Sequence, residues 1–93
     1  MELAERWRLI KAELIAAFEL LPSNIIESDN GYRKEDFLDY INANELLLAM
    51  EELDGVIEDN SSPSKEFWLH LISASKLMGN KHLTKYESIL NAT

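Results

Sequence analysis

Residues 42–60 read NANELLLAMEELDGVIEDN, a stretch that combines a helix-start pattern, an apolar face and a concentration of carboxylates. Asn42 followed by Glu45 is a capping-box pattern, in which each side chain accepts a hydrogen bond from the other residue's backbone N–H. We therefore expect a helix that begins at Asn42 and continues to Asp59. The i, i+3, i+4, i+7 spacing predicts that its core-facing residues are Leu46, Ala49, Met50, Leu53, Val56 and Ile57.

The opposite side of this predicted helix carries two rows of acidic residues without a Lys or Arg. The first row is Glu51, Asp54 and Glu58, and the second is Glu45, Glu52 and Asp59. On an amphipathic helix such carboxylates are expected to point into water. Leu47 and Leu48 also project away from the apolar face, beside the two rows. We expect at least one of them to pack against a flanking helix, and an exposed one would be an apolar anchor within an acidic rim, as in protein-binding patches.

Charge is distributed unevenly along the chain, which has 17 acidic and 9 basic residues and a formal net charge of -8. The segment over residues 35–59 has no basic residue and nine acidic ones, namely Glu35, Asp36, Asp39, Glu45, Glu51, Glu52, Asp54, Glu58 and Asp59. The rest of the chain is almost neutral. Such a field favours a cationic partner and disfavours nucleic acid or an anionic membrane surface. The alternative is a solvated helix face whose charge only keeps the protein soluble.

Length and composition indicate one small domain. The 93 residues, 46% of them apolar, fit a single globular unit with one core. The absence of cysteine excludes disulfides, a thiolate nucleophile and sulfur-ligated zinc. Glu2 and Glu5 make the N-terminus acidic, unlike a signal peptide, and no apolar run approaches the roughly 20 residues of a membrane span. We expect a soluble, intracellular protein that keeps its first residue.

Two helices are predicted before the acidic stretch. The first covers residues 2–21 and ends before Pro22, with an apolar stripe of Leu3, Trp7, Ile10, Leu14, Phe18 and Leu21. Ile25 and Ile26 are expected to pin the following loop to the core. A short helix over residues 32–41 is then expected to place three residues inward, Phe37, Leu38 and Ile41, and two outward, Asp36 and Asp39.

Two helices are predicted after the acidic stretch. Ser62 as N-cap with Pro63 at the first helical position predicts a helix that Gly79 ends. Thr84 and Glu87 form a second capping-box pattern, so a short last helix is expected over residues 85–91.

The predicted fold class is all-α. No stretch alternates with period two for long enough to indicate a strand. Gly55 falls on the outer side of the acidic helix, where we expect a glycine that is merely tolerated. The predicted architecture is a compact bundle of four main helices plus a short C-terminal helix, around Trp7, Phe18, Phe37, Leu53, Trp68 and Leu71.

Residue patterns for catalysis or metal binding are sparse. His70 and His82, the only two histidines, lie on different segments, and Glu66 with His70 would supply only half of a metal site. The acidic rows are predicted to face water rather than a desolvated pocket that would separate the pKa values of a catalytic pair. We therefore expect no catalytic residue, no cofactor and no metal, and an enzyme with carboxylate chemistry is the least favoured class.

The run over residues 39–83 carries a pattern of short helices and corners. A short corner leads into Glu45. Ala49 and the pair Glu52-Leu53 then lie on one helix, and a Ser-started helix ends in Leu77-Met78-Gly79. This pattern resembles the immunity proteins of bacterial polymorphic-toxin systems, with the closest similarity to the Maf-type immunity family and to helical immunity proteins of contact-dependent growth inhibition. It departs from that family at Asn44, where a glycine would be expected. The aspartate- and tyrosine-rich loop of colicin nuclease immunity proteins is absent.

The resemblance implies a cytoplasmic antidote that binds the C-terminal domain of a secreted toxin and blocks it. Several such toxins are RNases, including ones similar to EndoU nucleases, and a nuclease presents a cationic substrate groove. The expected partner is thus a basic toxin domain, with no direct binding of nucleic acid or membrane. The expected partner-binding residues are Asp36, Asp39, Glu45, Leu47, Leu48, Glu51, Glu52, Asp54, Glu58 and Asp59. The alternative is a non-catalytic helical adaptor or a self-associating structural module.

Overall fold

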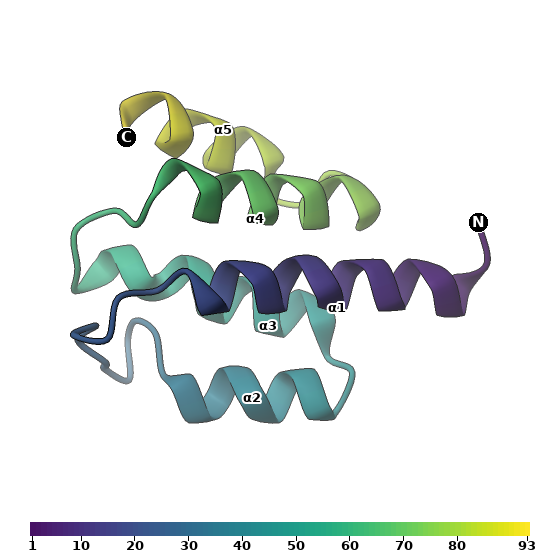
Figure 1. Cartoon of the computed structure of the whole chain (residues 1–93), viewed down its shortest axis with the longest axis horizontal. Helices are drawn as coiled ribbons and strands as arrows, with labels where there is room; N and C mark the ends of the chain where they lie inside the picture. Colours follow the sequence, from purple (N-terminus) through teal and green to yellow (C-terminus); the bar gives the residue numbers. More distant parts are fainter.

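Five α-helices and one 3-10 helix make up the regular structure of the chain in the computed structural model, which describes residues 1–93 (Figure 1). They are α1 (Leu3–Glu19), α2 (Lys34–Asn42), α3 (Leu46–Asp54), η1 (Gly55–Glu58), α4 (Lys65–Leu77) and α5 (Leu83–Ala92). No strand is present. The all-α class and the small helical bundle predicted from the sequence are confirmed.

The helices pack around the pair α1 and α4, which lie side by side (Figure 1). At one edge α2 packs on α3, and at the opposite edge α5 packs on α4. The N-terminal end of α1 extends beyond the other helices (Figure 1). Trp7 is therefore 43% exposed, although it continues the apolar stripe of α1. Its predicted place in the core is wrong because no neighbouring helix reaches that far.

The core is formed by apolar faces of all five α-helices. Its largest fully buried side chains are Trp68, Tyr86, Phe37, Phe67, Ile10, Leu14, Met50, Leu53 and Leu71. Phe18 is only partly buried and stacks on Phe37, with ring centroids 4.8 Å apart. Two residues predicted to point inward do not: Leu38 is 39% exposed and Ile26 is exposed on the loop before α2. Of the two isoleucines only Ile25 packs against the core, and the buried Tyr32 ties the end of the same loop to it.

The predicted capping box of the acidic helix does not form. Asn42 is the last residue of α2, so it is not available to begin the next helix. Glu45 is instead the N-cap of α3, and its side chain makes no capping hydrogen bond. The corner closes through the backbone, where Glu45 N–H donates to the Tyr40 carbonyl over 2.8 Å and Asn44 adopts a φ of 58°. A backbone turn has replaced the predicted side-chain cap.

The acidic helix also ends earlier than predicted, because α3 stops at Asp54 and the chain tightens into η1. Gly55 lies against Gly31 at this point. A Cβ on Gly55 would lie 3.0 Å from both the carbonyl carbon and the oxygen of Gly31. Backbone atoms have little room to move, so this position needs a glycine, and the prediction of a merely tolerated glycine is wrong.

The start of α4 differs from the prediction, whereas its end agrees. The N-cap is Ser64, whose hydroxyl accepts from the Phe67 N–H over 3.3 Å, rather than Ser62. Ser62 instead accepts from the indole N–H of Trp68 over 2.8 Å, which satisfies a donor in the core. Gly79 has a φ of 70° after the end of α4, as expected for a helix stop.

The last helix, α5, begins at Leu83 after His82, which has a positive φ of 61° and no capping side chain. The capping box predicted from Thr84 is therefore wrong.

Candidate functional site

The predicted acidic rows of α3 are largely occupied by contacts within the protein. Asp54 is 7% exposed, so its expected place on the outer surface is wrong. Its carboxylate accepts a hydrogen bond from the Tyr86 hydroxyl over 2.6 Å and lies 3.4 Å from the Lys85 ammonium. Burial raises the pKa of Tyr86, and Asp54 raises it further, so the phenol stays protonated and donates. Helix α5 has covered this side of α3.

Glu51 contributes to the same attachment of α5. Its carboxylate lies 2.7 Å from Nε2 of His82, just before α5. Both side chains are partly exposed, so this pair adds little stability by itself. Two of the three residues of the first predicted row, Glu51 and Asp54, therefore make contacts within the protein.

The second predicted row holds the loop between α1 and α2. Glu52 accepts from the backbone N–H of Arg33 over 2.7 Å, and Asp59 accepts from the Ser28 hydroxyl. Asn60 adds a reciprocal pair with the backbone of Ile26, at 2.8 and 2.9 Å. Burial raises the pKa of Glu52, and the Arg33 hydrogen bond opposes that rise. These side chains position the loop rather than stand free.

Within the acidic segment, residues 35–59, the carboxylates without an internal partner are Glu35, Asp36, Asp39, Glu45 and Glu58. Three of them lie on α2, and Glu35 and Asp39 are one helical turn apart on its outer side. Leu38 is exposed between them, and a shallow hollow is lined there by Glu27, Lys34, Glu35, Leu38, Asp39 and Asn42. We call Glu35, Leu38 and Asp39 the α2 acidic face. It is the part of the acidic segment that is most available for binding.

The two leucines behave as the sequence suggests. Leu47 packs on the core, as expected for at least one of the pair, and Leu48 is exposed on α3. Leu48 is therefore an apolar residue near the free carboxylates of the acidic segment.

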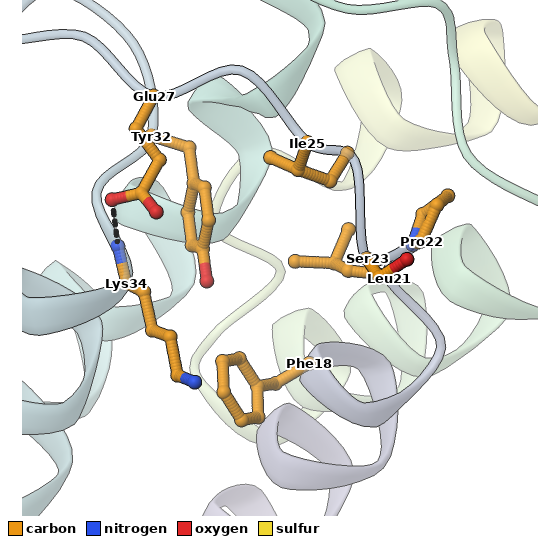
Figure 2. A pocket seen from close by; sticks show the side chains of 8 residues that line it. All are labelled: Phe18, Leu21, Pro22, Ser23, Ile25, Glu27, Tyr32 and Lys34. Atoms are coloured by element: carbon orange, nitrogen blue, oxygen red, sulfur yellow. Dashed lines mark hydrogen bonds between the residues drawn. The ribbon is translucent and has the colours of Figure 1, made fainter.

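A cavity of about 200 Å³ adjoins the α2 acidic face (Figure 2). It is lined by Phe18, Leu21, Pro22, Ser23, Ile25, Glu27, Tyr32 and Lys34. Glu27 and Lys34 also line the hollow on α2, so the two depressions share a wall. Glu27 accepts from the backbone N–H of Lys34 over 3.0 Å, which joins the loop to the start of α2. The apolar Ile25 in a polar loop is the main feature of the sequence that points to this cavity.

The histidines take part in pairs rather than in a metal site. His70 Nδ1 lies 2.7 Å from the carboxylate of Glu13 on α1, so the histidine pairs with another helix. No group of three or more His, Cys, Asp or Glu side chains is arranged to hold a metal ion. None of the helices has both the length and the apolar composition to cross a lipid bilayer.

No family model, curated protein or solved structure matches this chain.

Proposed function

We propose that this protein is an immunity protein, which binds the basic C-terminal domain of a secreted bacterial toxin in the cytoplasm and blocks it. The observation that carries the proposal is the α2 acidic face, whose carboxylates have no internal partner, within a segment of nine acidic residues and no basic one. The resemblance of residues 39–83 to immunity proteins supports it.

The physical argument rests on complementary charge. A nuclease binds phosphate through a cationic groove, and a rigid row of carboxylates on a helix complements such a groove. An interface of ordinary size would bury about 1,200–2,000 Å² in total, which exceeds what one short helix offers. The contact set we propose therefore extends from the α2 acidic face to Glu45, Leu48 and Glu58. An RNase, including one similar to EndoU nucleases, is the toxin activity we favour.

We leave four of the predicted residues out of the proposed contact set because they make contacts within the protein. Asp54 is buried under α5, and Glu51, Glu52 and Asp59 hold neighbouring parts of the fold. Replacing any of these four would also remove a contact within the protein, so the change would not report on binding alone. The α2 residues are better probes because a change there removes charge without breaking an internal contact.

The test uses the C-terminal toxin domain that the proposal expects to be encoded beside this chain. Expression of that domain should stop growth, and co-expression of the wild-type protein should restore it. The double variant Glu35→Lys/Asp39→Lys should fail to restore growth and should slow association roughly tenfold at low salt, because steering by charge is reversed. The control is Glu19→Lys/Glu87→Lys, which changes net charge equally on α1 and α5 and should protect. Equal protection by both variants would remove the α2 face from the proposal.

A second candidate is a self-associating structural module, which the exposed Leu3 and Trp7 on α1 favour. In that case the wild-type protein should be a dimer or larger in light scattering, and Trp7→Glu should make it a monomer. An immunity protein with its interface on α2 should keep its toxin affinity after Trp7→Glu. The two measurements together separate the candidates.

A further inference from the structure

We infer that the cavity between the end of α1, the following loop and the start of α2 is an anchor pocket, which receives one large apolar side chain from a basic segment of the partner. This inference rests on the proposed function, since it places the pocket at the edge of the same docking face. The pocket would hold the partner after electrostatic attraction has speeded its association.

The walls of the pocket suit an apolar side chain. Phe18 comes from the C-terminal end of α1, and Leu21 and Ile25 come from the loop that follows (Figure 2). The volume of about 200 Å³ is enough for one aliphatic or aromatic side chain. Anchor residues in pockets of this kind carry a large share of the binding energy in protein interfaces.

Tyr32 supplies the polar contact inside the pocket. The residue is 3% exposed, and its hydroxyl points into the cavity and bonds to no group of the protein (Figure 2). Burial raises the pKa of Tyr32, and the charges of Glu27 and Glu52 raise it further, so the hydroxyl keeps its proton. Because the hydroxyl is open to the cavity, it can donate to an oxygen acceptor that an occupant brings. The main-chain carbonyl beside an inserted side chain is such an acceptor.

The charges at the mouth select the partner. Glu27 lines the cavity, and Glu35 and Asp39 line the adjoining hollow, against the single cation Lys34. Lys34 Nζ lies 6.0 Å from the centre of the Phe18 ring, at the rim. This excess of negative charge disfavours a free anionic small molecule and favours Lys or Arg beside the inserted residue. The occupant we infer is therefore a protein segment with one large apolar residue flanked by basic ones.

The experiment measures both rate constants for binding of the neighbouring toxin domain. Tyr32→Phe removes only the hydroxyl and should speed dissociation about fivefold, as expected for one lost hydrogen bond. Ser23→Trp places a bulky side chain at the exposed rim and should speed dissociation at least about tenfold by filling the pocket. The controls are Tyr40→Phe on α2 and Ser73→Trp on the exposed side of α4, which should leave dissociation unchanged. Circular dichroism should show that all four variants keep the fold.

The outcomes separate the pocket from the proposed function. If the wild-type protein binds, Glu35→Lys/Asp39→Lys slows association and both pocket variants dissociate like the wild type, the pocket inference is overturned and the proposed function stands. If the wild-type protein does not bind the domain, the proposed function falls and the inference falls with it. If p-cresol shifts the NMR signals around Tyr32 but the bound domain does not, the cavity is a small-molecule site and the inference is again overturned.

Discussion

The hydroxyl of Tyr86 donates a 2.6 Å hydrogen bond to the carboxylate of Asp54, and both residues are buried between α5 and α3. The carboxylate that the sequence places on a binding surface is thus the anchor of the last helix. The contacts of Asp54 and of other buried groups lead to predictions that can be measured.

Tyr86→Phe should lower the free energy of unfolding by about 1–3 kcal/mol, because it leaves a buried carboxylate with only the Lys85 ammonium, 3.4 Å away. Urea titration measures the loss. Tyr40→Phe, which removes a hydroxyl without a partner, should change stability by less than about 0.5 kcal/mol. The double change Tyr86→Phe/Asp54→Leu should recover part of the loss, since it removes both polar partners. Similar losses in the two tyrosine variants would contradict this account.

Gly55→Ala should destabilise the protein by about 1–2 kcal/mol, because the new Cβ would meet the backbone of Gly31. In an ordinary exposed helix the same change would stabilise by about 0.5–1 kcal/mol. Ala12→Gly, on the exposed side of α1, is the matched control and should show the ordinary preference for alanine. Thermal or urea unfolding checks the sign. A stabilised Gly55→Ala variant would mean that the two backbones separate easily.

Ser62→Ala and Ser64→Ala should differ although the two serines are near neighbours. Ser62→Ala leaves the indole N–H of the buried Trp68 without its partner and should cost about 1–3 kcal/mol. Ser64→Ala removes the N-cap of α4 and should cost about 1 kcal/mol. In a Trp7→Phe background only Trp68 emits, so the Ser62 change alone should shift the fluorescence maximum. If the fluorescence maximum shifts in the Ser64 variant instead, Ser64 rather than Ser62 would be the partner of the Trp68 indole.

Glu52→Gln tests the raised pKa of a partly buried carboxyl. Because the folded-state pKa lies above the ordinary value of 4.5, the native state binds the proton more tightly than the unfolded chain. This contribution to stability is present below the unfolded pKa and is lost as pH rises through the folded one. Glu52→Gln keeps the acceptor for Arg33 N–H and should flatten the stability profile just above pH 4.5. An unchanged profile between pH 4 and about 7 would show that Glu52 is not the group responsible.

The helices could be predicted well because the spacing of apolar residues and the residues that end a helix are local properties of the sequence. The stripe of Ile10 and Leu14, the stop at Gly79 and the core positions Leu53 and Trp68 all follow from spacing within one helix. The residues of the candidate site were harder to predict, because the exposure of a side chain depends on helices far away in the sequence. No pattern in the sequence around Asp54 predicts that side chains of α5 cover it.

The same limit explains the errors in the caps and in the core. Asn42 carries a capping pattern, yet α2 extends through it, and the backbone closes the corner without a side chain. Trp7 continues a core stripe, yet α1 is longer than its neighbours (Figure 1). The cavity beside Tyr32 combines a helix end, a loop and a helix start, which no single pattern describes.

The loop between α1 and α2 has Tyr32 as its only buried residue, and polar side chains, chiefly Glu52 on α3 and Asn60 after η1, hold the rest of it. A segment secured in this way can detach as a cooperative unit while the helices stay folded, and amide hydrogen exchange would then be faster in the loop than in α4. Every detached molecule lacks one wall of the cavity. The apparent affinity for any occupant of the cavity is therefore reduced by the fraction of molecules with an open loop, so a substitution at Asn60 would weaken binding from a distance.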